Sequence, residues 1–82
     1  MNPREQLLQE LRATVKPREV FTDLFRRGCN ILALDAKAAA RVFDTSVPTA
    51  SRWLDGTTVP PAAEMVLRFL REELEREPVE SK

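Results

Sequence analysis

Several residue types on which enzymes and small cross-linked domains depend are absent or scarce in this chain of 82 residues. There is no histidine and no tyrosine, and there is one cysteine, Cys29. A single cysteine cannot form a disulfide within the chain, and an ordinary zinc site of cysteine and histidine lacks its ligands. Nucleophilic schemes that pair serine or cysteine with histidine are also excluded. We therefore expect no enzymatic activity, no metal and no cofactor.

Glycine and long apolar runs are scarce as well. The two glycines, Gly28 and Gly56, stand too far apart to form a glycine-rich phosphate loop. No apolar run approaches the ~18 residues that span a bilayer, and the N-terminus lacks the apolar core of a signal peptide. We therefore expect no membrane partner and a cytoplasmic location.

The charges balance, with 13 basic and 13 acidic residues, and a zero net charge gives no support by itself to a nucleic-acid partner. Their distribution is uneven. Residues 16–60 carry seven basic groups against five acidic ones, whereas residues 61–82 carry four against six. The middle of the chain is mildly basic, which is compatible with DNA binding but is weak evidence for it.

Prolines mark the starts of the first two predicted helices. Asn2 can cap a helix that has Pro3 as its first residue and Glu5 at the third position of a capping box. Pro17 ends this helix because it moves Lys16 out of the helical region. The helix carries a narrow apolar stripe, which either packs on the domain or forms a dimer contact: Leu7, Leu8, Leu11 and Val15.

The second helix is predicted to run from residue 17 to residue 28. Its last turn is Arg26-Arg27-Gly28, with basic residues followed by glycine just past the helix end. Cys29 follows, and we expect it to be a small buried apolar residue. The helix has a broad apolar face for the core: Val20, Phe21, Leu24 and Phe25.

Residues 35–56 hold two short helix signals separated by a polar break. Asp35 can cap a helix from Ala36 to about Phe43, and Ser46 can cap another that ends before Gly56. Two short helices joined by a turn of three or four residues are typical of a helix-turn-helix unit. The second helix of such a unit commonly enters the DNA major groove.

A fifth helix is predicted to begin at Pro60 or Pro61, and the chain after Pro78 is short and polar. Its predicted inner face is Met65, Val66, Phe69, Leu70 and Leu74. Its predicted outer ion pairs are Glu64/Arg68, Arg68/Glu72 and Glu72/Arg76. With five helices and no strand signals, we expect an all-α fold.

A helical wheel divides residues 46–55 into two sides. Ala50, Trp53 and Leu54 cluster within one third of the circumference and should face the core. The opposite side is short and polar, with Val47 and Thr49 on its flanks: Pro48, Ser51, Arg52 and Asp55. Short side chains let a recognition helix sit deep in a groove about 12 Å wide.

This wheel predicts five residues that contact bases: Val47, Pro48, Thr49, Ser51 and Arg52. Arg52 can donate two hydrogen bonds to guanine or bind a phosphate, although it can also be an ordinary surface arginine. Val47 and Pro48 suit a thymine methyl group, and the two hydroxyls suit bases or phosphates. Asp55 would repel phosphate, so we expect it to cap or orient a neighbour.

Four residues are predicted to contact phosphates: Lys37, Arg41, Ser46 and Thr58. Lys37 lies at the start of the helix that crosses the DNA backbone in a helix-turn-helix unit, where free N–H groups attract anions. An exposed lysine without function explains this residue equally well.

The segment Ser51-Arg52-Trp53-Leu54-Asp55-Gly56, followed by Pro60, lies in a stretch that resembles the helix-turn-helix of lambda-repressor-like (Cro/repressor, XRE-type) regulators. The resemblance covers Leu32 to about Leu70, and Ala40 stands at the small-residue position where the two helices touch. The turn departs from the family pattern. Asp44 stands where the family usually has glycine, and Thr45 replaces an apolar residue. Aspartate can adopt a left-handed conformation, though less readily than glycine.

This resemblance implies a five-helix lambda-repressor-like domain at residues 17–77, with an N-terminal helical extension at 1–16 and a polar tail at 78–82. It also implies a bacterial or phage transcription regulator, a small repressor or autoregulator that binds an inverted-repeat operator of double-stranded DNA as a homodimer. No effector domain is expected, hence no small-molecule ligand. The alternative is a protein–protein interaction module that keeps the fold without binding DNA, which the zero net charge favours.

Overall fold

The computed structural model describes residues 2–76, which form five helices and no strand. The helices are α1 (Pro3–Ala13), α2 (Pro17–Ile31), α3 (Ala36–Val42), α4 (Val47–Asp55) and α5 (Ala63–Arg76). The all-α prediction is confirmed. The predicted polar tail at 78–82 lies outside the described residues.

Three helices begin at the capping residues expected from the sequence. The side-chain oxygens of Asn2 and Asp35 each accept a hydrogen bond at 2.8 Å from the backbone N–H three residues later. The Ser46 hydroxyl oxygen accepts one from the N–H of Thr49 at 3.2 Å. Each cap gives a partner to one of the N–H groups that a helix start leaves free.

Three residues with positive φ end helices: Ala33 at 58°, Asp44 at 56° and Gly56 at 84°. In each case the N–H of the following residue bonds to a carbonyl in the last turn of the helix, at 2.8, 2.9 and 3.0 Å respectively. This closure is the Schellman motif. Gly56 was predicted in this position, and Asp44 adopts the left-handed conformation that the turn requires.

Gly28 was wrongly predicted to end the second helix. α2 continues to Ile31, and Gly28 is buried inside it where α5 comes closest. A Cβ added to Gly28 would lie 2.6 Å from either terminal methyl carbon of Leu70. The glycine therefore serves the approach of two helices, and Ala33 takes the left-handed position beyond the helix end.

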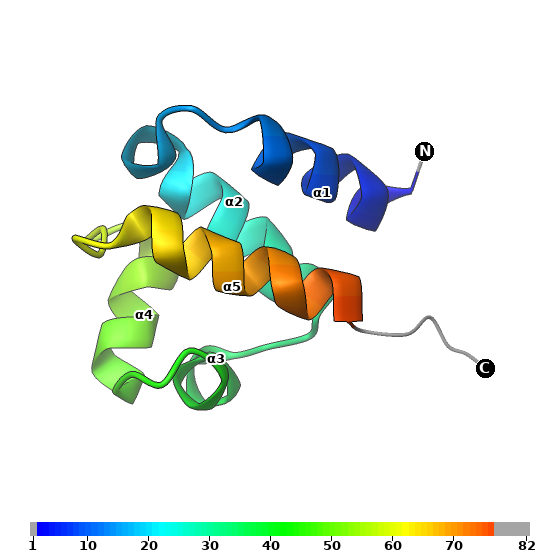
Figure 1. Ribbon diagram of the computed structural model, residues 1–82. Helices are drawn as coiled ribbons and strands as arrows, with labels where there is room; N and C mark the ends of the chain where they lie inside the picture. Colours follow the sequence, from blue (N-terminus) through cyan, green and yellow to red (C-terminus); the bar gives the residue numbers. More distant parts are fainter. Residues whose placement is uncertain (1, 77–82) are drawn as a thin grey trace.

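α2 lies at the centre of the fold. It packs against α1, α4 and α5, and α1 also packs against α5, while α3 packs against α4 (Figure 1). Leu7, Leu8 and Leu11 of α1 are buried in the common core. Of the two interpretations of this stripe, packing on the domain is therefore the one observed.

Three predicted apolar faces are corrected in part by the structure. α1 ends at Ala13, so Val15 lies in the connector to α2 and is 87% exposed. α5 begins at Ala63, after a turn at Pro61 and Ala62. It buries Leu70 and Leu74 as predicted, but the rest of its buried stripe is Ala63 and Leu67. Met65 and Phe69 are 51% and 45% exposed. Each lies two residues from the buried Leu67, and two residues along a helix correspond to a rotation of about 200°, so both point away from the core. Val20 of α2 is also exposed.

The charged pairs differ from those predicted on α5. Among residues 2–76, none of Glu64/Arg68, Arg68/Glu72 and Glu72/Arg76 forms an ion pair. Glu73 and Glu75 are used instead. Glu73 pairs with Arg76 at 2.7 Å, and Glu75 pairs with Arg12 of α1 at 2.7 Å. The Glu73/Arg76 pair has i,i+3 spacing within α5, whereas Arg12 lies on another helix, which side-chain spacing alone does not reveal.

A forked ion pair joins α1 to α2. The two Nη atoms of Arg27 donate to the two carboxylate oxygens of Glu10 at 2.7 and 2.8 Å. The hydrogen bond from Arg27 holds the pKa of Glu10 below its usual value. Arg27 was predicted only as a favourable charge near a helix end. It pairs with Asp23 of its own helix at 3.0 Å as well as with Glu10 of α1. None of the helices described is long and apolar enough to cross a bilayer.

The close approach at Gly28 predicts that Gly28→Ala lowers the free energy of unfolding by about 1–3 kcal/mol, since Leu70 is fully buried and must move to admit the new methyl group. Urea denaturation measures this change. The control is Ala33→Gly on the same chain segment, which should leave stability equal or higher because φ there favours glycine. Unchanged stability in Gly28→Ala would contradict this account of the α2–α5 contact.

Candidate nucleic-acid interface

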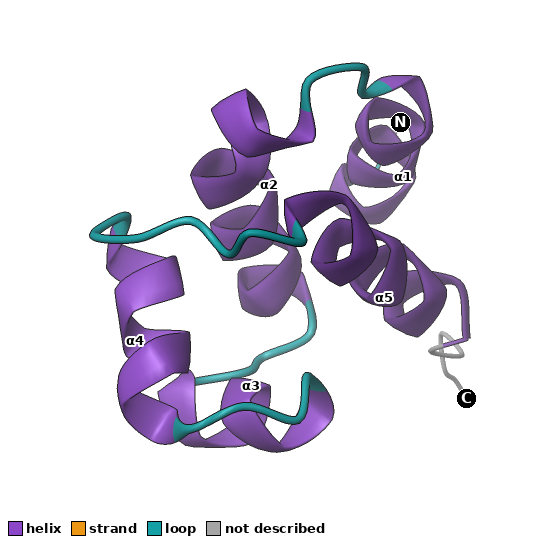
Figure 2. Cartoon of the chain, turned by 60° about the vertical axis from the view of Figure 1, so that its left-hand side comes forward, coloured by secondary structure: helices purple, strands orange, loops and turns teal. Residues whose placement is uncertain are grey.

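α3 and α4 form a compact pair joined by a four-residue turn, from Phe43 to Ser46 (Figure 2). Small buried side chains line the surfaces of the two helices, with Ala39 and Ala40 on α3 and Ala50 on α4. Small side chains let two helices approach closely, and α3 and α4 pack directly against each other. Two short helices joined by a four-residue turn therefore lie where the sequence predicted them.

Trp53 anchors α4 to the centre of the fold. Its ring meets Phe21 and Phe25 of α2 edge-on, with ring centroids 5.9 and 5.7 Å apart. Phe25 also contacts Phe43 of the turn at 5.2 Å. Trp53 and Ala50 are buried and Leu54 is half-buried, so the prediction that this side of α4 faces the core is confirmed.

The C-terminal end of α4 is held by two further contacts. Arg26 of α2 donates from Nε to the carbonyl oxygen of Leu54 at 2.9 Å. Asp55 accepts hydrogen bonds from both the hydroxyl and the N–H of Thr57. These two bonds, chiefly the one from the hydroxyl, hold the pKa of Asp55 below its usual value, and the charges of Arg26 and Arg52 add to the effect. Asp55 thus orients a neighbour, as predicted, whereas nothing local in the sequence signals the contact of Arg26.

The outward side of α4 presents most of the residues predicted to contact bases. Val47, Pro48, Ser51 and Arg52 are exposed, while Thr49 is half-buried. The side chains are short except for Arg52, so the backbone of α4 can approach a flat or concave partner closely.

Two predicted contact residues are already engaged with each other. The Ser46 hydroxyl donates to the hydroxyl oxygen of Thr49 at 2.8 Å while accepting from the Thr49 N–H. Ser46 therefore cannot donate the same hydrogen to a phosphate unless this bond breaks. The Thr49 hydroxyl keeps its own hydrogen for a base or a phosphate.

The remaining predicted phosphate contacts, Lys37, Arg41 and Thr58, are exposed. Within residues 2–76, Lys37, Arg41 and Arg52 take part in no ion pair and in no side-chain hydrogen bond. The basic residues that stabilise the fold are different ones, such as Arg18, whose Nη1 donates to the carbonyl oxygen of Pro60 at 2.9 Å. The cations of α3 and α4 are thus available for a partner.

Acidic residues balance these cations locally. Asp35 caps α3, Asp44 lies in the turn and Asp55 is the last residue of α4. Asp35 and Asp55 are occupied with backbone N–H groups, which leaves Asp44 as the exposed acid of the turn. The surface of α3 and α4 is therefore polar and mixed in charge, and recognition here must come from individual contacts more than from a strong positive field.

Other chemistry is not apparent at this surface. The described residues contain no group of three or more histidine, cysteine or acidic side chains that could hold a metal ion. Cys29 is buried in the core, as predicted, and burial raises the pKa of its thiol to about 12. The thiol is therefore protonated at neutral pH and shielded from solvent.

No family model, no curated protein and no solved structure matches this chain. The lambda-repressor-like resemblance thus has no support from a relative. What bears on function is the geometry of α3 and α4 and the side chains that they expose.

The aromatic anchor predicts that Trp53→Ala lowers the free energy of unfolding by about 3–5 kcal/mol, because it leaves a cavity between α4 and α2. Chemical denaturation gives the value. Ser51→Ala on the exposed side of the same helix is the control and should change stability by less than about 0.5 kcal/mol. Equal effects of the two substitutions would show that Trp53 does not hold α4 in place.

Proposed function

We propose that this protein is a DNA-binding transcription regulator of the lambda-repressor-like helix-turn-helix kind, which represses by occupying an operator as a homodimer. In each half-site α4 lies in the major groove. The observation that carries the proposal is the division of α4 into a buried side anchored by Trp53 and an exposed side of short residues around Ser51 and Arg52.

The dimensions of α4 suit a major groove. An α-helix with its side chains measures about 10–12 Å across, and the major groove of B-DNA is about 12 Å wide. Arg52 can reach a guanine with two hydrogen bonds, and Ser51 can bond either kind of base. Val47 and Pro48, exposed at the start of α4, offer apolar contact to a thymine methyl group.

Phosphate contacts would set the position of α4 on the duplex. Lys37 and Arg41 lie one turn apart on α3, both exposed and without an intramolecular partner among the described residues. Each contact would displace counterions from the DNA, so the affinity should depend strongly on salt. Thr58, in the connector after α4, offers a further hydroxyl.

α5 supplies a surface for the dimer. Met65 and Phe69 lie one turn apart on its outer side and are about half exposed. The leucines of the α1 stripe, which was the other possible dimer contact, are buried within the chain, so α5 is the stronger dimer surface. A two-fold dimer would place its two α4 helices in half-sites about 34 Å apart.

The second candidate is a protein-interaction module without DNA binding. It is favoured by the zero net charge of the chain and by the three acidic residues in and beside α3, α4 and their turn, Asp35, Asp44 and Asp55, which match the number of basic residues there. The two candidates differ in whether a specific complex with duplex DNA forms at low salt.

We predict that Arg52→Ala weakens binding to duplexes selected by this protein from a random pool, by about 1–3 kcal/mol, and relaxes selection at one base pair. Fluorescence anisotropy on the selected duplex measures affinity, and thermal unfolding shows whether the fold is intact. Lys16→Ala is the matched control, since it removes an exposed charge from the α1–α2 connector, away from α4. Equal affinities for Arg52→Ala and the native protein would show that α4 does not read bases through this residue.

A salt titration of the same duplex gives a second prediction. The logarithm of the affinity should fall linearly with the logarithm of the salt concentration, and Lys37→Ala should reduce the slope by about 1 without changing the preferred sequence. Lys16→Ala should leave the slope as it is. If no duplex is selected over random DNA at low salt, the interaction-module candidate replaces the regulator.

A further inference from the structure

The outward side of α5 carries an apolar ridge. Met65 and Phe69 lie one turn apart and are 51% and 45% exposed, and Ala62, just before α5, is exposed as well. Met65 and Phe69 point away from the stripe that α5 buries against α1 and α2. Rows of residues four apart form the ridges by which helices pack on one another. The outward side of α5 therefore presents a ridge of the kind that packs on a second helix.

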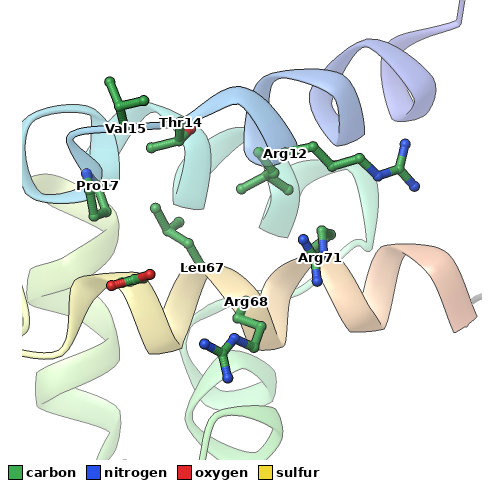
Figure 3. Close-up of a pocket in the computed structure, with 9 residues that line it drawn as sticks. Arg12, Thr14, Val15, Pro17, Leu67, Arg68 and Arg71 are labelled. Carbon is green, nitrogen blue, oxygen red and sulfur yellow. The ribbon is translucent and has the colours of Figure 1, made fainter.

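A row of charges of alternating sign runs beside this ridge. Glu64 and Arg68 stand four residues apart, and Glu72 and Arg76 continue the row. Figure 3 shows Arg68 extending from α5 away from α1 and its connector, whereas Leu67 points toward the connector. Glu64 and Arg68 are exposed and take part in no ion pair and no side-chain hydrogen bond among residues 2–76. Both charges are therefore available to a partner.

The two rows are self-complementary in one antiparallel register. When a two-fold axis passes residue 66, Glu64 of each copy lies opposite the partner's Arg68. Phe69 then lies over the partner's Ala62 and Met65, so apolar surface meets apolar surface. An axis at residue 68 places Arg68 opposite the partner's Arg68, and like charges repel. An axis at residue 70 also pairs opposite charges, but it places Met65 against the charged end of α5.

We propose that two copies of this chain associate through α5 in the register centred on residue 66, with Met65 and Phe69 in the middle and two Glu64–Arg68 ion pairs at the edge. This inference rests on the proposed function for its homodimer, and it adds the register and the residues that determine it. A two-fold interface uses the same patch on both copies, so the ion pair occurs twice. Exposed ion pairs contribute little affinity, so the apolar ridge supplies most of the attraction and the charges select the register.

The test is sedimentation equilibrium of charge-reversed variants in the absence of DNA. Arg68→Glu alone and Glu64→Arg alone should each weaken the dimer at least about tenfold, because either change makes both facing pairs repulsive. An equimolar mixture of the two variants should dimerise within about threefold of the native affinity, because every facing pair again has opposite charges. High salt should reduce these differences.

Two further variants test the ridge and the register separately. Phe69→Ala should weaken the dimer at least about tenfold through lost apolar contact. Its thermal unfolding should stay nearly unchanged at a concentration where the native protein is monomeric, because Phe69 is half-exposed. Arg76→Glu is the matched charge control, since this residue of the same row lies opposite no charge of the partner's α5 in the proposed register. Its dimer constant should stay within about threefold of the native value.

Three results would overturn the proposal. The first is a native protein that stays monomeric at about 1 mM, where even a weak interface associates. The second is a mixture of Arg68→Glu and Glu64→Arg that dimerises no better than either variant alone. The third is an Arg76→Glu variant weakened as much as Arg68→Glu, which is the result expected for the register centred on residue 70.

The dimer and the DNA contacts can fail separately. A monomeric protein that still selects a duplex would overturn this interface and the homodimer, while the contacts of α4 with DNA would stand. A dimer that forms in the proposed register but selects no duplex would overturn the regulator and leave the α5 interface in place.

Discussion

The packing of Trp53 against the stacked rings of Phe21 and Phe25 on α2 is the contact on which the surface of this protein depends. Because the indole meets Phe21 and Phe25 edge-on, α4 has one orientation relative to α2. α2 is in turn held by α5, through the close approach at Gly28. The residues that α4 exposes are therefore determined by those that it buries, and Ser51 and Arg52 lie on the side opposite the buried Trp53.

The arginines show why net charge is a poor guide to partners in a small helical protein. Arg4 and Arg18 donate to backbone carbonyl oxygens, and Arg27 binds Glu10 across two helices. These three arginines therefore stabilise contacts within the fold. The cations of α3 and α4 have no such role among the described residues, so a chain of zero net charge still exposes basic groups beside its proposed recognition helix.

Features with a local cause could be predicted from the sequence, and features with a distant cause could not. The caps at Asp35 and Ser46, and the inward side of α4, follow from residues within a few positions of one another. Gly28 was misinterpreted because the residue that requires it, Leu70, belongs to another helix. The buried stripe of α5 differs from the predicted one for a similar reason, because the positions of α1 and α2 determine which residues of α5 are buried. The hydrogen bond from the Ser46 hydroxyl to the Thr49 hydroxyl joins two residues that were predicted to contact DNA. Residue types alone do not reveal this bond.

The central claim is that the exposed side of α4 is a DNA-binding surface. NMR titration of ¹⁵N-labelled protein with a duplex that it selects tests this claim most directly, because it locates contacts without assuming the role of any one side chain. We predict that the largest amide shifts fall on residues 47–52, with smaller ones on residues 37–41. Shifts confined to α1 or α5, or no shifts in low salt, would contradict the claim.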